Sequence, residues 1–239
     1  MSEESHPRNS GVRPVVTLDG LSGSGKSTLA RKLAEALGWA YLDSGAWYRA
    51  LTWATLREGA DPTDSGQVLD VLSRLTLSST PSGDVLVDDH RPGQELRTPA
   101  IDASVSEVAD HPQVRAALTA RMQQLREQPQ VHGVVADGRD AGAVIFPDAA
   151  LKIFVEVSLD VRAARRFAQQ QAAGLDTTLD QAHQALAQRD ARDAARGEAA
   201  PQIHPGDQVL QNDNLSVEEA IRRLLAWTQA TYGSDCAAS

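Results

Sequence analysis

The 239-residue sequence contains a single cysteine, Cys236, so no disulfide can form within the chain. It also lacks any run of about eighteen apolar residues, the length that a membrane-spanning helix needs. The polar segment Met1–Arg13 has no apolar core of the kind found in secretion signals, and we expect it to be a disordered tail. These absences predict a protein of the reducing cytoplasm that does not associate with membranes.

Histidine and net positive charge are scarce as well. The six histidines include no pair at metal-ligand spacing on one helix and have no companion cysteines, so we expect no structural zinc. A formal net charge of −9 argues against a broad surface for nucleic acid or anionic lipid and favours small ligands. The length and the 41% hydrophobic content suit one compact α/β domain over residues 14–239.

Residues 20–28, with the sequence GLSGSGKST, match the phosphate-binding P-loop pattern G-x-x-x-x-G-K-[ST]. The apolar run Val15–Leu18 predicts a buried strand before the loop, and the four-residue spacing of three leucines predicts a helix after it that ends at Gly38. The glycines allow successive backbone N–H groups to turn inward on phosphate oxygens. A chance match in a flexible turn is the alternative, and the strand–turn–helix context argues against it.

The P-loop pattern assigns roles to individual residues. Lys26 is expected to reach the β- and γ-phosphates of a nucleoside triphosphate, and the hydroxyl of Ser27 is expected to hold Mg²⁺. The residues expected to bind ATP are Gly20, Ser22, Gly23, Ser24, Gly25, Lys26, Ser27 and Thr28.

A second strand is expected over residues 39–42, and ligands of open α/β sheets collect at the ends of such strands. Ser44 is placed to cap the helix that follows, which is expected over residues 46–56. The first turn of this helix carries Tyr48 and Arg49. These two side chains could receive a phosphate or could simply serve the core.

A third buried strand is expected over residues 131–136, directly before Asp137, and further strands over residues 151–157 and 208–210. A carboxylate at the position of Asp137 could organise Mg²⁺ through water, opposite the P-loop. An ordinary Asp-Gly turn is the alternative.

Between the second and third strands, residues 59–98 alternate in short apolar runs broken by proline, glycine and aspartate, which predicts a small β-rich insertion ending near residue 104. Helices are then expected over residues 99–109 and 112–126, because each stretch begins with proline. Ser106 and Arg115 lie on these helices without any local signal of function.

Arginines gather on two consecutive helices in the last third of the chain, each time on one helical face. Such a stripe is either a solvated face stabilised by ion pairs or a lid, here about residues 160–197, whose guanidinium groups close over phosphates. A P-loop in an acidic protein favours the lid. The residues of the stripe are Arg162, Arg165, Arg166, Arg189, Arg192, Asp193 and Arg196.

P-loop proteins include switches, motors and small-molecule kinases, so the loop alone does not name the reaction. The chain has no Asn-Lys-x-Asp motif for guanine and is shorter and less basic than a motor. Four segments, in the same order, resemble the bacterial cytidylate kinase family: residues 18–28, 41–49, 136–149 and 189–193. The resemblance extends from about Val15 to the terminal helix.

The resemblance implies a P-loop NTPase fold with three layers around a parallel sheet, an insertion in the monophosphate-binding part and a helical lid. It implies phosphoryl transfer from ATP to CMP or dCMP with Mg²⁺, by a monomer. The residues implied to stabilise the transferring phosphoryl group are Lys26, Arg162, Arg166 and Arg192. The residues implied to bind CMP are Ser44, Tyr48, Arg49, Ser106, Arg115, Arg139, Asp140, Arg189, Asp193 and Arg196.

The implied CMP ligands divide by role into acceptor-phosphate ligands (Arg49, Arg139, Arg196), cytosine readers (Ser106, Arg115, Asp140), sugar contacts (Arg189, Asp193) and residues that shape the pocket (Ser44, Tyr48). A carboxylate at Asp140 can accept a hydrogen bond from the N4 amino group of cytosine. Uracil would turn a carbonyl oxygen toward that carboxylate, so UMP is expected to be a poor substrate.

The chain departs from the usual family pattern at Leu21, where proline is usual, at Ser27, where glycine often stands, and at residues 211–214 (QNDN), where Asp-Ser/Thr-Thr is usual. We therefore assign no contacts to the donor base near residues 211–214. Two other functions stay open at this point. One is a related kinase for another nucleoside monophosphate or for shikimate, and the other is a nonenzymatic P-loop protein that senses nucleotide.

Overall fold

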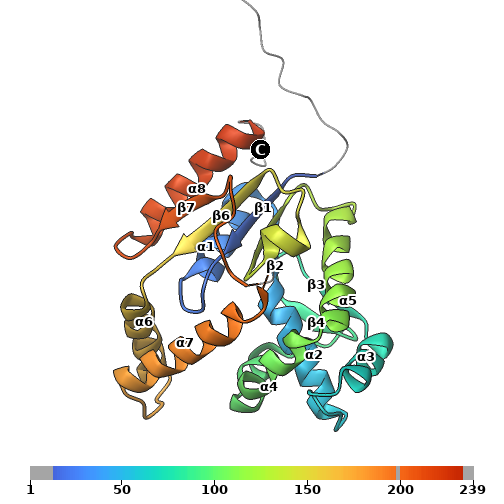
Figure 1. Cartoon of the computed structure of the whole chain (residues 1–239). Coiled ribbons are helices and arrows are strands. Elements are labelled where there is room, and N and C mark those ends of the chain that lie inside the picture. Colours follow the sequence, from blue (N-terminus) through green and yellow to red (C-terminus); the bar gives the residue numbers. More distant parts are fainter. Residues whose placement is uncertain (1–12, 198–199, 234–239) are drawn as a thin grey trace, which may run out of the picture.

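The computed structural model describes residues 13–197 and 200–233. The predicted tail, apart from Arg13, and Cys236 lie outside the described residues. A five-stranded sheet in which every neighbouring pair is parallel forms the centre, with the strand order β2-β5-β1-β6-β7 (Figure 1). Its strands are β1 (Val15–Asp19), β2 (Ala40–Asp43), β5 (Val134–Gly138), β6 (Leu151–Glu156) and β7 (Gln208–Gln211). The predicted α/β class with a parallel central sheet is confirmed.

Helices α1 (Lys26–Leu37) and α8 (Val217–Tyr232) pack together with one face of the sheet. The three leucines of α1 are buried, as their spacing predicts, and Gly38 ends the helix in the left-handed conformation with φ 66°. The other face packs with α2 (Ser44–Arg57) and α5 (Pro112–Gln123), which the short 3-10 helix η2 (Gln124–Glu127) extends. The molecule therefore has three layers, with helices on both faces of a buried sheet.

The segment between α2 and α5 mixes helix and strand. It contains α3 (Ser65–Arg74), the hairpin of β3 (Leu77–Ser79) and β4 (Val85–Val87), the 3-10 helix η1 (Gly93–Arg97) and α4 (Pro99–Asp110). Helix α3 was not predicted, although Asp64 caps its first backbone N–H groups and Val68, Val71 and Leu72 are buried at helical spacing. The alternation of apolar and polar residues in this segment predicted only the strands.

Helices α6 (Leu159–Ala172) and α7 (Leu179–Ala194) form a hairpin at the carboxyl edge of the sheet. In Figure 1 this hairpin lies across from α2 and α4, below the ends of the strands. Thr178 and Gln181 form a capping box that starts α7. No helix within residues 13–197 and 200–233 has both the length and the apolar character to span a membrane.

Candidate active site

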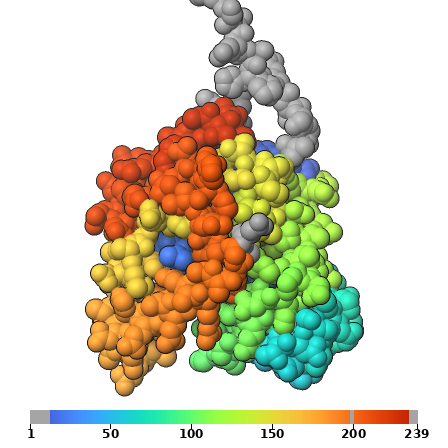
Figure 2. All heavy atoms as spheres, in the orientation of Figure 1, coloured from blue at the N-terminus to red at the C-terminus, as the bar shows by residue number. Residues whose placement is uncertain are grey.

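A cavity of about 960 Å³ opens at the carboxyl ends of the strands, between the α6–α7 hairpin and the segment from β4 to α4. Figure 2 shows blue atoms of the N-terminal part of the chain at the bottom of a hollow framed by the yellow and orange atoms of later segments. Eleven cationic side chains and the five carboxylates of Asp43, Asp84, Asp137, Asp140 and Asp193 line the cavity. The cationic residues are Lys26, Arg31, Arg49, Arg91, Arg97, Arg115, Arg139, Arg165, Arg166, Arg189 and Arg196. A protein of net charge −9 thus presents a strongly positive cavity, which suits a polyanionic ligand.

The P-loop connects β1 to α1 at one end of this cavity, as its sequence context predicts. Gly20 (φ 153°), Gly23 (φ 81°) and Gly25 (φ 84°) all have positive φ. A Cβ atom at Gly20 would lie 2.6 Å from the carbonyl oxygen of Val155, so glycine is required there by space as well as by conformation. Gly25 is the N-cap of α1, which directs the positive helix end at the cavity.

Two residues outside the loop hold it in place. Asn212 donates a hydrogen bond from Nδ2 to the carbonyl oxygen of Ser24 (3.1 Å). Arg165 donates to the same oxygen (3.3 Å) and to the carbonyl oxygen of Asn212 (2.7 Å). Arg165 was predicted only as part of the lid stripe, and Asn212 was given no role from the sequence. The position of Asn212 directly after the last strand was the one signal that could have pointed to it.

Lys26 lies in the loop with 6% of its surface exposed. Burial, followed by the positive charge of Arg139, lowers the pKa of this ammonium group to about 7. Its Nζ donates a 3.3 Å hydrogen bond to the carbonyl oxygen of Leu21. A buried ammonium that faces a phosphate-sized cavity is a ready partner for phosphate oxygens.

Asp137 stands opposite Lys26 at the end of β5, and both of its oxygens accept hydrogen bonds. Ser27 donates to Oδ2 at 2.6 Å, and the buried hydroxyl of Tyr41 donates to Oδ1 at 2.7 Å. Burial and the nearby charge of Asp43 raise the pKa of Asp137 to about 6. The hydroxyl of Ser27 and the carboxylates of Asp137 and Asp43 are oxygen donors of the hard type that Mg²⁺ prefers, so these residues fit that ion.

The end of β2 differs in one detail from the sequence analysis. Asp43, not Ser44, caps α2: its Oδ1 accepts a 2.9 Å hydrogen bond from the backbone N–H of Ala46. Ser44 is the first residue of the helix, and its hydroxyl donates to the carbonyl oxygen of Asp137 (2.8 Å). The helix starts two residues earlier than predicted, because the Asp43 carboxylate already accepts from a backbone N–H of its first turn.

A buried carboxylate at the end of β1 shapes the turn after β5. Asp19 accepts hydrogen bonds from the backbone N–H groups of Ala141 (2.7 Å) and Gly142 (2.8 Å), the first residues of the π-helix η3 (Ala141–Ile145). Burial raises the pKa of Asp19 to about 6. By fixing the start of η3, Asp19 sets the position of the preceding Arg139 and Asp140.

At the far end of the cavity, Asp193 of α7 lies between two arginines. Its Oδ2 accepts from Nε of Arg139 (2.9 Å) and its Oδ1 accepts from Arg196 (2.6 Å). Arg196 also donates to Asp110 at 2.8 Å. Beside them, Nε of Arg189 is buried with no hydrogen-bond partner among the described residues, and burial lowers the pKa of this guanidinium to about 10. This group is poised for an anion.

Arg115 and Asp140 form an ion pair on the wall of the cavity, with the side chains 16% and 8% exposed. The guanidinium of Arg115 lies 5.8 Å from the ring centroid of Tyr48, and Ser106 lines the same wall. Burial raises the pKa of Asp140, and the positive charge of Arg115 partly offsets this rise. Arg49 is held nearby by Asp102 (2.6 Å) and by the carbonyl oxygen of Leu96 (3.0 Å).

The structure brings nearly all of the residues expected from the sequence to this one cavity. The exceptions are Gly20, Ser24, Arg162 and Arg192. Gly20 and Ser24 are buried parts of the loop backbone, and Arg192 is exposed on α7. Arg162 is 3% exposed, makes two hydrogen bonds to Asp190 (3.2 and 2.7 Å) and donates to the carbonyl oxygen of Ser22 (3.1 Å), so it joins α6, α7 and the P-loop.

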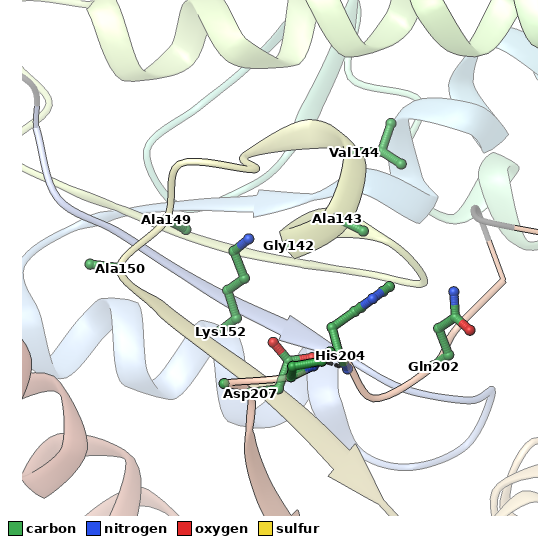
Figure 3. Close-up of a pocket in the computed structure, with 11 residues that line it drawn as sticks. Gly142, Ala143, Val144, Ala149, Ala150, Lys152, Gln202, His204 and Asp207 are labelled. Atoms are coloured by element: carbon green, nitrogen blue, oxygen red, sulfur yellow. Dashed lines mark hydrogen bonds between the residues drawn. The ribbon is translucent and has the colours of Figure 1, made fainter.

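A second cavity, of about 690 Å³, lies between η3, the start of β6 and the segment that precedes β7 (Figure 3). Its charged groups already have partners within the protein. Lys152 donates to the carbonyl oxygen of Pro147 (2.8 Å), and Asp207 accepts from the backbone N–H of His204 (2.8 Å). None of the residues that the sequence predicts to bind nucleotide lines this second cavity.

Comparison with known proteins gives a consistent result. A family model described as cytidylate kinase matches residues 16–230. A protein named cytidylate kinase from Polynucleobacter asymbioticus is 40% identical over 217 residues, which cover 91% of this chain and 97% of that protein. A protein of the same name from Pectobacterium carotovorum is 39% identical over 222 residues, covering 91% and 97%. In fold alone, a solved structure of an uncharacterised protein from Eubacterium ventriosum is similar, with a TM-score of 0.51, 12% identity and coverage of 91% of this chain and 99% of that one.

Proposed function

Because the chain belongs to the cytidylate kinase family, we propose that it transfers the γ-phosphoryl group of ATP to CMP or dCMP, giving CDP or dCDP and ADP. Membership of the family makes it an enzyme that phosphorylates a nucleoside monophosphate. The choice of ATP as donor and of cytosine as the acceptor base is our proposal.

One observation carries this proposal: the Arg115–Asp140 pair lies in the same cavity as the P-loop. Cytosine offers an amino group at N4 and acceptors at N3 and O2. Asp140 would accept from N4, and Arg115 would donate to N3 or O2. Uracil would place its O4 against the carboxylate, and this mismatch of two acceptors would exclude UMP.

Three arginine side chains near the proposed base site could bind the acceptor phosphate. Arg139 and Arg196 are fixed by Asp193, and Arg49 is fixed by Asp102 and Leu96. We infer that these three guanidinium groups hold the acceptor phosphate in line with the donor, because planar guanidinium groups match phosphate oxygens in pairs. A phosphate oxygen is already anionic, so the reaction needs no general base.

The donor phosphates would lie on the P-loop. Backbone N–H groups of residues 22–28 and the ammonium of Lys26 would neutralise the β- and γ-phosphates, and Arg165 and Arg166 line the cavity on the side of α6. Ser27, with Asp137 through water, would hold Mg²⁺, which supplies positive charge to the phosphates when bound. Arg162 would contribute by anchoring α6 and α7 to the loop, and the exposed Arg192 would reach the phosphates only after closure of the lid.

We propose that the lid (residues 160–197) and the insertion (residues 59–104) close over the two substrates and exclude water, which would otherwise accept the phosphoryl group. The cavity separates the two segments, which supports this division of the chain. We propose that the enzyme acts as a monomer, as the family resemblance implies.

The test is a coupled assay of ADP release with MgATP and, in parallel, CMP, dCMP, UMP, AMP or shikimate. We expect strong turnover with CMP and dCMP and weak turnover with the other three. Turnover of a different acceptor would overturn the assignment of Ser106, Arg115 and Asp140 as cytosine readers. Binding of ATP with no turnover of any acceptor would instead support a nucleotide sensor.

A further inference from the structure

The carboxylate of Asp137 is held from two sides by residues that differ in their exposure to the cavity. Ser27, on the P-loop helix, lines the cavity and donates to Oδ2. Tyr41, in β2, is 1% exposed, is not among the lining residues, and donates to Oδ1. Because each carboxylate oxygen accepts a hydrogen bond, the plane of the carboxylate is fixed. Tyr41 holds it from the side that faces away from the cavity.

Tyr41 also contacts the turn between β3 and β4. Its backbone N–H donates to the carbonyl oxygen of Pro81 (2.9 Å). Gly83 approaches the ring so closely that an added Cβ atom would lie 2.2 Å from Cδ1 of Tyr41. Only glycine fits there, both for space and because φ is +84°.

Arg31 of α1 contacts both the Tyr41 ring and the β3–β4 turn. Its guanidinium lies 4.8 Å from the centroid of the Tyr41 ring and donates a 2.9 Å hydrogen bond to the carbonyl oxygen of Ser82. Arg31, Gly83 and Asp84 all line the cavity beside Ser27. A turn that belongs to the insertion is therefore connected, through one aromatic ring, to the carboxylate of Asp137 at the end of β5.

We propose that Tyr41 is a positioning residue that couples the β3–β4 turn to the Asp137–Ser27 pair. In this arrangement the docked turn holds the ring, the ring hydroxyl orients Asp137, and Asp137 orients the hydroxyl of Ser27 toward the nucleotide-bound metal. The inference rests on the proposed function, since it assigns Ser27 and Asp137 to Mg²⁺.

A binding measurement tests this coupling without turnover. Isothermal titration calorimetry with ADP, once in MgCl₂ and once in EDTA, gives the factor by which the metal tightens ADP binding. Tyr41→Phe retains the ring and removes only the hydroxyl. We expect this factor to fall about tenfold, as is typical when a residue that orients a metal ligand is removed. The affinity for ADP in EDTA and the affinity for CMP should both stay within about twofold of the unmodified protein.

Tyr232→Phe is the matched control. It also removes one tyrosine hydroxyl that donates a hydrogen bond, here to the carbonyl oxygen of Val15 at 2.6 Å, at the amino end of β1 and away from Asp137. We expect no change in the metal-dependent factor. Gly83→Ala tests the other half of the coupling, because its methyl group must displace the Tyr41 ring. It should reduce the factor, and the double variant with Tyr41→Phe should lose less than the product of the two single losses.

The outcomes separate the inference from the function beneath it. If Mg²⁺ tightens ADP binding equally in the unmodified protein and in Tyr41→Phe, Tyr41 does not position the site and the inference is wrong, while the proposed function stands. If Mg²⁺ does not tighten ADP binding even in the unmodified protein, the proposed metal site and the inference both fall. Independent losses for Gly83→Ala and Tyr41→Phe would overturn the coupling to the turn.

Discussion

Nε of Arg139 donates a 2.9 Å hydrogen bond to Oδ2 of Asp193, and this contact joins the end of β5 to helix α7 across 54 residues of sequence. Asp193 is only 2% exposed, and its second oxygen holds Arg196. A single buried carboxylate thus fixes two of the three arginines that we assign to the acceptor phosphate. It also ties the proposed lid to the sheet.

Asp193→Asn should therefore weaken the acceptor site more than the donor site. The amide retains an oxygen but loses the charge that orders both arginines, and hydrogen bonds to charged groups contribute about 1.5–3 kcal/mol. We expect KM for CMP to rise at least about tenfold, with KM for ATP changed less than about threefold. Steady-state kinetics with each substrate varied in turn measures both. An equal rise in the two KM values would contradict this role.

Asp140→Asn should relax the choice of base. An amide NH₂ can donate to O4 of uracil, where the carboxylate can only repel it. We expect the ratio of kcat/KM for UMP to that for CMP to rise about a hundredfold. Asp148→Asn, at an exposed carboxylate that pairs with Arg126, is the matched control and should leave the ratio unchanged. An unchanged ratio in Asp140→Asn would show that the base is read elsewhere.

Lys26 should make the binding of nucleotide phosphates depend on pH. Burial lowers its pKa to about 7, so the free protein loses this positive charge as the pH rises above about 7. Bound phosphates favour the charged form, so ADP binding above pH 7 must take up a proton, and the affinity should fall by up to about tenfold per pH unit.

Calorimetry of ADP binding in EDTA at pH 6.5 to 8.5, in buffers of different ionisation enthalpy, detects the proton directly. Lys26→Arg retains a charge over this whole range and should show no uptake from this position. Identical proton uptake in the two proteins would mean that another group titrates.

Arg162 should matter for stability as well as for activity. It is buried, pairs with Asp190 and donates to the P-loop, so Arg162→Leu would leave the Asp190 carboxylate without its partner. We expect a loss of about 3–5 kcal/mol in the free energy of unfolding, which lowers Tm by at least about 6 °C in a chain of this size. Thermal denaturation followed by circular dichroism measures the shift.

The exposed Arg192 provides the comparison. Arg192→Leu should change the free energy of unfolding by no more than about 0.5 kcal/mol, since the side chain is exposed on α7. If it lowers kcat at unchanged Tm, Arg192 acts on the phosphates in the closed state. If Arg162→Leu leaves Tm unchanged, the structural role of Arg162 is wrong.

Much of the site was predictable because its signals are local in the sequence. The P-loop pattern requires glycines at fixed spacing between a strand and a helix, and the structure places Gly20, Gly23 and Gly25 at positive φ there. Asp137 was found because a carboxylate follows an apolar strand. Ser106 and Arg115 were different: the helix sequence around them gave no signal, and only the family resemblance pointed to them.

Other features depend on contacts between distant segments, and the local sequence does not reveal those contacts. Asn212 and Arg165 meet at the carbonyl oxygen of Ser24 from positions 188 and 141 residues away along the chain. Arg162 and Arg166 share one helical face in the sequence, yet the first is buried in an ion pair and the second lines the cavity. The spacing of residues in the sequence predicts which side chains share a helical face, but it does not predict what each of them contacts.

The sequence by itself therefore determined the parallel α/β class, the P-loop and the position of Asp137 at the end of a strand, because these follow from spacing within about ten residues. The tertiary structure decided which of the arginines face the cavity, which carboxylate holds each of them, and that Tyr41 joins the insertion to Asp137. Those choices depend on how the sheet, the hairpin of α6 and α7 and the insertion pack together, and burial and charge pairing are properties of that packing alone.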